Sequence, residues 1–116
     1  MPIIKVWCLP GGQSENKLRL LHQEIVAGVV EISELGISNE KQITCLFPPD
    51  LMSYGLGEEI IVEVTGLFSK PERTREVRNK LAKSIGQRVK KLYPNSMVEV
   101  LVYPFTQDVN SYWKAD

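Results

Sequence analysis

Apolar and polar residues follow two spacings along this 116-residue chain, and the two spacings succeed each other in the same order twice. Four short apolar runs stand at 3–9, 43–47, 60–67 and 97–103. In the stretch between the first and second runs, and again between the third and fourth, apolar residues recur every three or four positions, as one face of a helix requires. The four bounding runs are short and apolar, which is typical of strands. The pattern therefore predicts strand, helix, strand, and then the same again.

The two predicted helices are marked by apolar stripes and by capping residues. The stripes consist of Leu18, Leu21, Ile25, Val29 and Ile32 in the first helix, and of Val77, Leu81, Ile85, Val89 and Leu92 in the second. Ser14 suits an N-cap of the first helix, and Gly36 suits a left-handed C-terminal cap. Ser69 and Glu72 match the S-x-x-E capping box, so the second helix is expected to begin there, with Pro71 in its first turn.

These elements indicate an α+β fold built from two β-α-β repeats. Each strand–helix–strand crossover is expected to be right-handed, which places two antiparallel helices on one face of a four-stranded mixed sheet. A length near that of a typical domain predicts a single domain over 1–116. The pseudo-repeats span 1–57 and 58–105, and an aromatic, polar tail over 106–116 has neither strand nor helix spacing.

Composition and charge disfavour several classes of protein. The 14 basic and 14 acidic side chains cancel, which argues against nucleic acid as a partner. No run of 18 apolar residues is present and the start lacks the features of a signal peptide, so no membrane association is expected. Cys8 and Cys45 both fall in predicted strands, which predicts a reduced, cytoplasmic protein with two small buried hydrophobes and no metal site.

Pro2 permits two interpretations. Proline cannot donate to a strand ladder, so a place at the start of a strand suits it for purely structural reasons. If Met1 is removed, however, Pro2 becomes an N-terminal secondary amine, and an α-amino group titrates at about 7.7–8.0 before any perturbation. Such a group can act as a base near neutral pH, which makes Pro2 the candidate catalytic residue.

The segments around these features resemble the tautomerase superfamily. PIIKVWCLPGGQSENK is similar to the opening of the oxalocrotonate tautomerase group, and Ser53-Tyr54-Gly55-Leu56-Gly57 resembles the segment that closes that group's short chain. PPDLMSYG, 48–55, is similar to a loop of macrophage migration inhibitory factor, whose length and doubled unit also match. The resemblance implies a cofactor-independent tautomerase that forms a homotrimer or larger ring, with Pro2 as general base toward a small carbonyl or carboxylate substrate.

The resemblance also implies where substrate would bind, and here the chain departs from its relatives. The arginines that grip a carboxylate in the oxalocrotonate tautomerase group fall on Gly12 or Gln13 and around Ile43 and Thr44. The second unit offers Lys70 and Arg73 instead, although a solvated helix start also explains both residues. Tyr54 matches a pocket aromatic that would cover a neighbouring subunit's Pro2, and packing within its own loop explains it equally well.

The tail and two strand carboxylates complete the candidate residues. Asp108 to Trp113 resembles the tail of the migration-factor branch, so Tyr103, Tyr112 and Trp113 are expected near a subunit boundary, with Tyr103 and Trp113 as candidate substrate contacts. Glu63 and Glu99 interrupt apolar strands, which favours a structural place on the sheet face opposite the helices.

Two functions remain open, a tautomerase that uses Pro2 and a non-catalytic oligomeric binding protein of the same fold.

Overall fold

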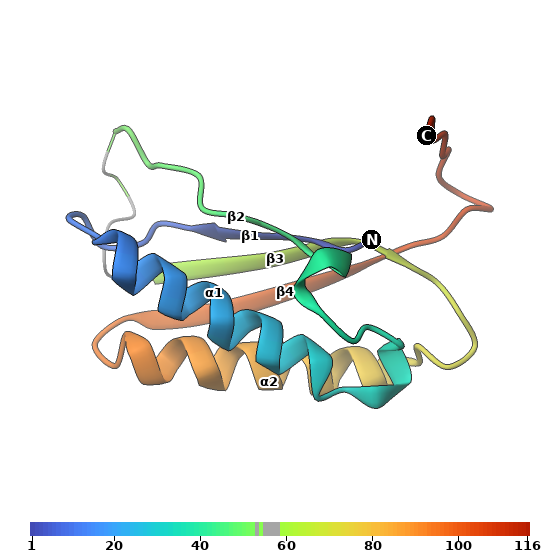
Figure 1. Ribbon diagram of the computed structural model, residues 1–116, viewed down its shortest axis with the longest axis horizontal. Helices are drawn as coiled ribbons and strands as arrows, with labels where there is room; N and C mark the ends of the chain where they lie inside the picture. The colour runs from blue at the N-terminus through green and yellow to red at the C-terminus, as the bar shows by residue number, and fades with distance from the viewer. Residues whose placement is uncertain (53, 55–58) are drawn as a thin grey trace.

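The computed structural model describes residues 1–52, 54 and 59–116. Its elements in chain order are β1 (Ile3–Trp7), α1 (Glu15–Val30), the 3₁₀ turns η1 (Ser33–Leu35) and η2 (Glu40–Gln42), β2 (Thr44–Leu46), β3 (Glu59–Phe68), α2 (Arg75–Leu92) and β4 (Met97–Phe105). The sheet order is β2-β1-β3-β4; the outer pairs are parallel and the central pair is antiparallel. Both helices lie on one side of this sheet (Figure 1). The α+β fold with two β-α-β units is confirmed.

The observed strands differ from the predicted ones at their ends. β1 ends at Trp7, two residues earlier than expected, because Cys8 has a left-handed backbone with φ 65° that breaks the extended conformation. Cys8 therefore lies outside the strand, whereas Cys45 lies in β2 as predicted, and both are half-buried free thiols. Burial raises the pKa of the Cys45 thiol to about 11, so this thiol stays protonated and unreactive.

The predicted start of the first helix, at Ser14, is confirmed. The predicted start of the second helix, at Ser69, is wrong. The Ser14 hydroxyl accepts a hydrogen bond from the backbone N–H of Lys17 (3.1 Å). In the second unit Thr74 is the N-cap, and its hydroxyl accepts from the N–H of Val77 (3.2 Å). Ser69 does not cap α2, since its hydroxyl pairs with that of Thr106 (3.0 Å) and its N–H donates to the Phe105 carbonyl (2.9 Å), which extends the pairing of β3 with β4.

Gly36 has the predicted left-handed conformation (φ 68°), but it caps η1. α1 ends six residues earlier, at Val30, followed by the helical C-cap residue Glu31. The left-handed conformation predicted for Gly36 is correct. The end of α1 was predicted too late because η1, the short 3₁₀ turn between α1 and Gly36, has no apolar periodicity of its own.

The core lies between the sheet and the two helices. It contains most of both predicted stripes together with every second strand residue: Leu21, Ile25, Val29, Val77, Leu81, Ile85 and Val89 from the helices, and Ile4, Val6, Ile60, Val62 and Val64 from the strands. Strand residues alternate between the two faces of a sheet. Leu67 of β3 also belongs to this core, and Cys45 of β2 and Val98, Val100 and Val102 of β4 pack against it, so the strand residues that alternate with these face away from the helices. None of the described helices is long and apolar enough to cross a membrane.

We call the side of the sheet that faces away from the helices the open sheet face. Its members are Thr44 and Leu46 of β2, Ile3, Lys5 and Trp7 of β1, Ile61, Glu63 and Thr65 of β3, and Met97, Glu99 and Leu101 of β4. The indole N–H of Trp7 donates to the carboxylate of Glu63. Lys5 lies directly across from Glu63 in the register of β1 with β3. Glu63 thus has partners, and both strand carboxylates lie on the face where the sequence placed them.

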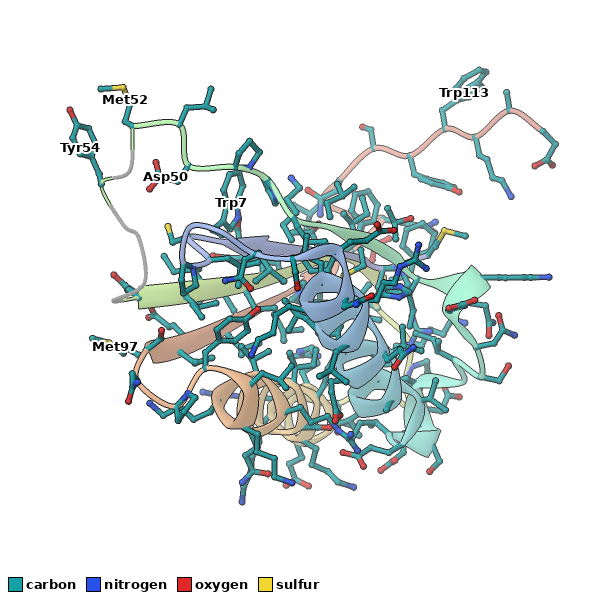
Figure 2. All side chains as sticks on the ribbon, turned by 60° about the vertical axis from the view of Figure 1, so that its left-hand side comes forward. Trp7, Asp50, Met52, Tyr54, Met97 and Trp113 are labelled. Carbon is teal, nitrogen blue, oxygen red and sulfur yellow. The ribbon has the colours of Figure 1, made fainter. Side chains whose placement is uncertain are left out.

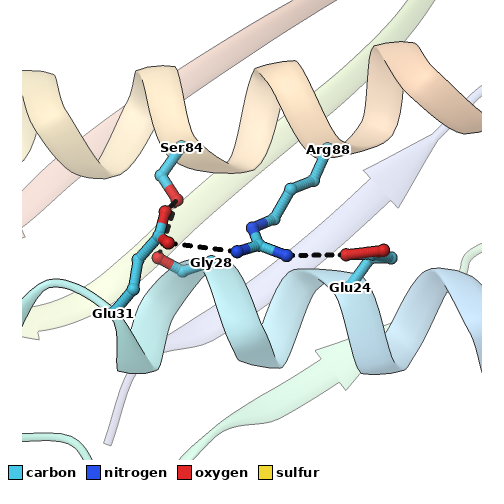
Figure 3. A network of polar contacts seen from close by, with 5 residues as sticks. All are labelled: Glu24, Gly28, Glu31, Ser84 and Arg88. Carbon is cyan, nitrogen blue, oxygen red and sulfur yellow. Dashed lines mark hydrogen bonds and ion pairs between the residues drawn. The ribbon is translucent and has the colours of Figure 1, made fainter.

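A polar network joins the two helices on their outer side (Figure 3). Arg88 of α2 donates to Glu24 (2.7 Å) and to Glu31 (3.0 Å). The Ser84 hydroxyl lies within hydrogen-bond distance of the Gly28 carbonyl (2.9 Å) and of the Glu31 carboxylate. A Cβ at Gly28 would lie 3.1 Å from both Ser84 and Arg88, so the absence of a side chain there lets α1 and α2 approach each other.

Candidate functional site

The strand topology gathers several chain segments at one end of the sheet. β1 runs parallel to β2 and antiparallel to β3, so Ile3 pairs with Thr44 on one side and with Thr65 on the other. The beginning of the chain therefore lies beside the start of β2 and the end of β3. The turn over 69–74 and the tail over 106–116 also leave from this end, where the N label stands in Figure 1. We call it the N-terminal end of the sheet.

Pro2 is buried at this end, directly before β1. Its carbonyl accepts a hydrogen bond from the backbone N–H of Thr44 (3.0 Å), and its lack of an N–H costs nothing at a strand start. Gly66 lies alongside, in a bulge of β3 with φ 69°, and a Cβ there would stand 3.1 Å from the Met1 carbonyl oxygen. Glycine at 66 therefore allows β3 to pass close to the first peptide bond.

The amino group of the chain lies in surroundings that disfavour its charged form. Burial lowers the pKa of the Met1 amino group, and the positive charges of Arg73, Lys114 and Lys70, in that order, lower the same pKa further. Lys70 and Arg73 come from the turn before α2, and Lys114 comes from the tail. Three cations from two distant stretches of sequence thus act on one amine.

The guanidinium of Arg73 is engaged with the backbone. Its two terminal nitrogens donate to the carbonyls of Phe68 and Leu35, each at 2.8 Å. Its Nε is buried and has no hydrogen-bond partner among the described residues, and burial lowers the pKa of the guanidinium. Arg73 joins the end of β3 to η1. It contributes its positive charge to the site, but both terminal nitrogens of its planar guanidinium, its fork, are already bound.

Lys70 and the tail border a hollow of about 310 Å³ at the same end. Phe68, Ser69, Phe105, Thr106 and Gln107 also line it. Tyr112 packs edge-on against Phe68, with ring centroids 4.8 Å apart, and thereby holds the tail near the hollow. Trp113 is 84% exposed, and the Lys114 ammonium pairs with Asp116 (3.1 Å) in full contact with solvent.

The two remaining candidate residues lie at different places within one copy of the chain, and Tyr103 is near the end of β4, between residues that pair with Val64 and Leu67 of β3. Tyr54 is 86% exposed and stands at the opposite end of the molecule from Trp113 (Figure 2). Tyr103 is 47% exposed on the edge strand β4, beside Arg75 and Arg78 of α2. The other positions of the quoted aromatic–glycine segment, residue 53 and residues 55–57, lie outside the described residues.

Sequence reasoning found Pro2, Lys70 and Arg73, which the structure brings to one end, and it missed Lys114. The signal for Lys114 was its place next to Trp113 in the aromatic tail, but a lone lysine there also fits a solvated tail. No three His, Cys, Asp or Glu side chains gather as metal ligands in the described ranges.

The comparisons with known proteins give matches in structure alone. No protein-family model and no curated protein matches the sequence. A fused 4-oxalocrotonate tautomerase described as a symmetric trimer matches with 17% identity and a TM-score of 0.66, over 90% of this chain and 86% of that one. The chain has the tautomerase fold.

Two further structures with this tautomerase fold match over nearly the whole chain. Malonate semialdehyde decarboxylase, solved in wild-type, inactivated and first-proline-to-alanine mutant forms, is 16% identical with a TM-score of 0.64, over 98% of this chain and 92% of that one. A protein of unknown function from Vibrio cholerae is 12% identical with a TM-score of 0.66, over 97% and 83%. The resemblance inferred from the sequence is therefore confirmed at the level of the fold, and the low identities fit an atypical branch.

Proposed function

We propose that this chain is a cofactor-independent tautomerase that interconverts keto and enol forms of a small carbonyl compound, with Pro2 as general base once Met1 has been removed. The observation that carries the proposal is the lowered pKa of the amino group at the N-terminal end of the sheet. The same burial and positive charges would favour the neutral, proton-accepting form of a secondary amine at Pro2. The matching decarboxylase, with its first-proline mutant, adds support from a protein of the same fold.

The mechanism needs few groups. The neutral amine of Pro2 removes a proton from the carbon next to a carbonyl, and the protonated amine returns that proton to the other end of the enol or enolate. The positive charges of Lys70, Arg73 and Lys114 favour the anionic oxygen that develops between the two steps. They also favour a substrate that carries a carboxylate, which would bind at Lys70 because the Arg73 fork is occupied.

A homotrimer is part of the same proposal. The open sheet face carries Leu46, Ile61 and Leu101 together with the oppositely charged Lys5 and Glu63, a mixture suited to burial against further copies. Two of the matching structures are described as trimers. In such an assembly Tyr54 and Trp113, both largely exposed in the single chain, would contact a neighbouring subunit near its Pro2. The two free cysteines support a reducing compartment, such as the cytoplasm.

Intact-mass analysis followed by a ketonisation assay with phenylenolpyruvate tests the proposal. We expect the native protein to begin at Pro2 and to ketonise the enol, and the Pro2→Ala variant to lose about 100-fold or more in kcat, since a general base contributes 10²–10⁴-fold. Gly11→Ala is the control, because a Cβ there meets nothing within 4 Å. Retained Met1, or Pro2→Ala with undiminished activity, contradicts the proposal.

The second candidate function is a non-catalytic oligomeric binding protein. The engagement of Arg73 favours it, because both terminal guanidinium nitrogens already donate to backbone carbonyls and are not free to hold a substrate carboxylate. A processed, trimeric protein that does not act on phenylenolpyruvate and is unaffected by Pro2→Ala is the result expected of this candidate.

A further inference from the structure

Thr44 contacts the start of the chain through both its backbone and its side chain. Its backbone N–H holds the Pro2 carbonyl (3.0 Å), and its hydroxyl donates to the Met1 sulfur (3.4 Å). The hydroxyl is thus directed at the residue that is covalently joined to the Pro2 nitrogen. Once Met1 is removed, the space that its side chain occupies lies beside this hydroxyl.

A thioether sulfur is a weak hydrogen-bond acceptor. The contact with Met1 therefore leaves the Thr44 hydroxyl with unused capacity to donate, and a carbonyl or enolate oxygen in the same space is a stronger partner. Thr44 is half-buried on the open sheet face, so a bound oxygen would be partly shielded from competing water.

From this geometry we infer that Thr44 is a substrate-binding residue, whose hydroxyl donates to the carbonyl oxygen of the substrate while Pro2 takes the neighbouring proton. The inference rests on the proposed tautomerase function. It assigns the two parts of a keto acid to separate groups, the reacting carbonyl to the neutral donor Thr44 and the carboxylate to the cations of the turn and the tail. A donor aimed at an oxygen that gains charge during the reaction accelerates the chemical step more than it strengthens binding.

Thr65 provides a matched control. It pairs with the same residue, Ile3, from the other neighbouring strand, and its side chain shares the open sheet face with Thr44. Within the part of the chain that the structure describes, no hydrogen bond joins it to Met1, whereas the Thr44 hydroxyl makes one. If the replacement of any threonine beside β1 lowers activity, both the Thr44 and the Thr65 variants should lose it. If Thr44 has a specific role, only the Thr44 variant should.

The test compares Thr44→Val, Thr44→Ser and Thr65→Val in protein whose mass shows that it begins at Pro2. With phenylenolpyruvate we expect Thr44→Val to lower kcat about 10- to 100-fold with little change in KM, because the lost donor acts on the transition state. Thr44→Ser should restore most of kcat, and Thr65→Val should match the wild type. Equal losses in Thr44→Val and Thr65→Val, or no loss in Thr44→Val, overturn the inference while leaving the tautomerase proposal intact.

A second measurement separates this inference from the proposed function. 2-Oxo-3-pentynoate, a reagent that inactivates one of the matching proteins, carries a carbonyl conjugated to an alkyne. A neutral amine adds to the far alkyne carbon, the N–C bond forms, and the amine proton ends on the carbon next to the carbonyl, so the mass rises by the whole reagent. If the wild type is labelled at Pro2, Thr44→Val should react roughly tenfold more slowly, because the carbonyl is no longer polarised. If the wild type shows neither labelling nor turnover, both proposals are refuted together.

Discussion

At the scale of single residues, the proposed site is a set of charges and one hydroxyl around the start of the chain. Lys70, Arg73 and Lys114 lower the pKa of the amino group from positions that carry no common sequence pattern. Their roles differ, since Arg73 is held by the Phe68 and Leu35 carbonyls. Lys70 and Lys114 are largely solvated, so their effect on the amine depends on ionic strength.

The lysine charges make a prediction about pH. The proton-accepting form of Pro2 is the neutral amine, so kcat/KM should rise as the pH rises through the amine pKa and then level off. In the double variant Lys70→Gln, Lys114→Gln the amine loses two positive neighbours, its pKa increases, and the rise in kcat/KM moves to higher pH. The measurement is a pH–rate profile at low salt with phenylenolpyruvate.

Lys91→Gln, which removes one charge from the last turn of α2, is the control and should leave the profile in place. Added salt should reduce the difference between the double variant and the wild type. A profile that stays in place in the double variant, or moves to lower pH, contradicts the proposed effect of these lysines on the base.

At the scale of elements, two β-α-β units share one sheet, and the ends of their helices decide where the site groups lie. Because α2 begins at Arg75 and not at Ser69, the turn between β3 and α2 is long enough to carry Lys70 and Arg73 back toward Pro2. Had α2 begun at the sequence capping box, both residues would lie on its first turn.

This difference can be measured by stability. Thr74→Ala should lower the free energy of unfolding by about 1 kcal/mol, because the N–H of Val77 loses its cap. Ser69→Ala should change it by less than about 0.5 kcal/mol, since the exposed Ser69 hydroxyl caps no helix. Urea unfolding of both variants at one pH checks the pair. A larger cost for Ser69→Ala would restore the capping box as the start of α2.

At the scale of the whole molecule, both described helices cover one face of the sheet, and we propose that the other face packs against further copies of the chain. The open sheet face combines apolar side chains with the Lys5, Trp7 and Glu63 cluster.

A pair of leucines tests the assembly. Leu46 lies on the open sheet face and is 45% exposed; Leu20 lies on α1 and is 43% exposed. We expect the wild type to run in size-exclusion chromatography with light scattering at three times the 13.1 kDa chain mass. Leu46→Glu should dissociate it, because a carboxylate cannot be buried unpaired between subunits, whereas Leu20→Glu should not. A wild-type monomer, or dissociation by Leu20→Glu alone, contradicts this arrangement.

The sequence was sufficient for the number and order of strands and helices, for the stripes such as Leu21, Ile25 and Val29 that enter the core, and for the β-α-β arrangement. Apolar periodicity and capping are local properties, and each repeat folds back on itself over a short stretch of chain. Pro2 could also be found, because a proline behind an initiator methionine is visible in the sequence.

Tertiary structure alone decided what surrounds Pro2. Lys114 and Thr44 meet the start of the chain from 112 and 42 positions further along it, and Arg73 is turned onto the carbonyls of Phe68 and Leu35. Strand pairing and the exit of the tail bring these groups together, and the spacing of residues along the chain cannot predict such contacts. The capping box at Ser69 was overruled for the same reason, since its N–H was already bound to Phe105 across the sheet.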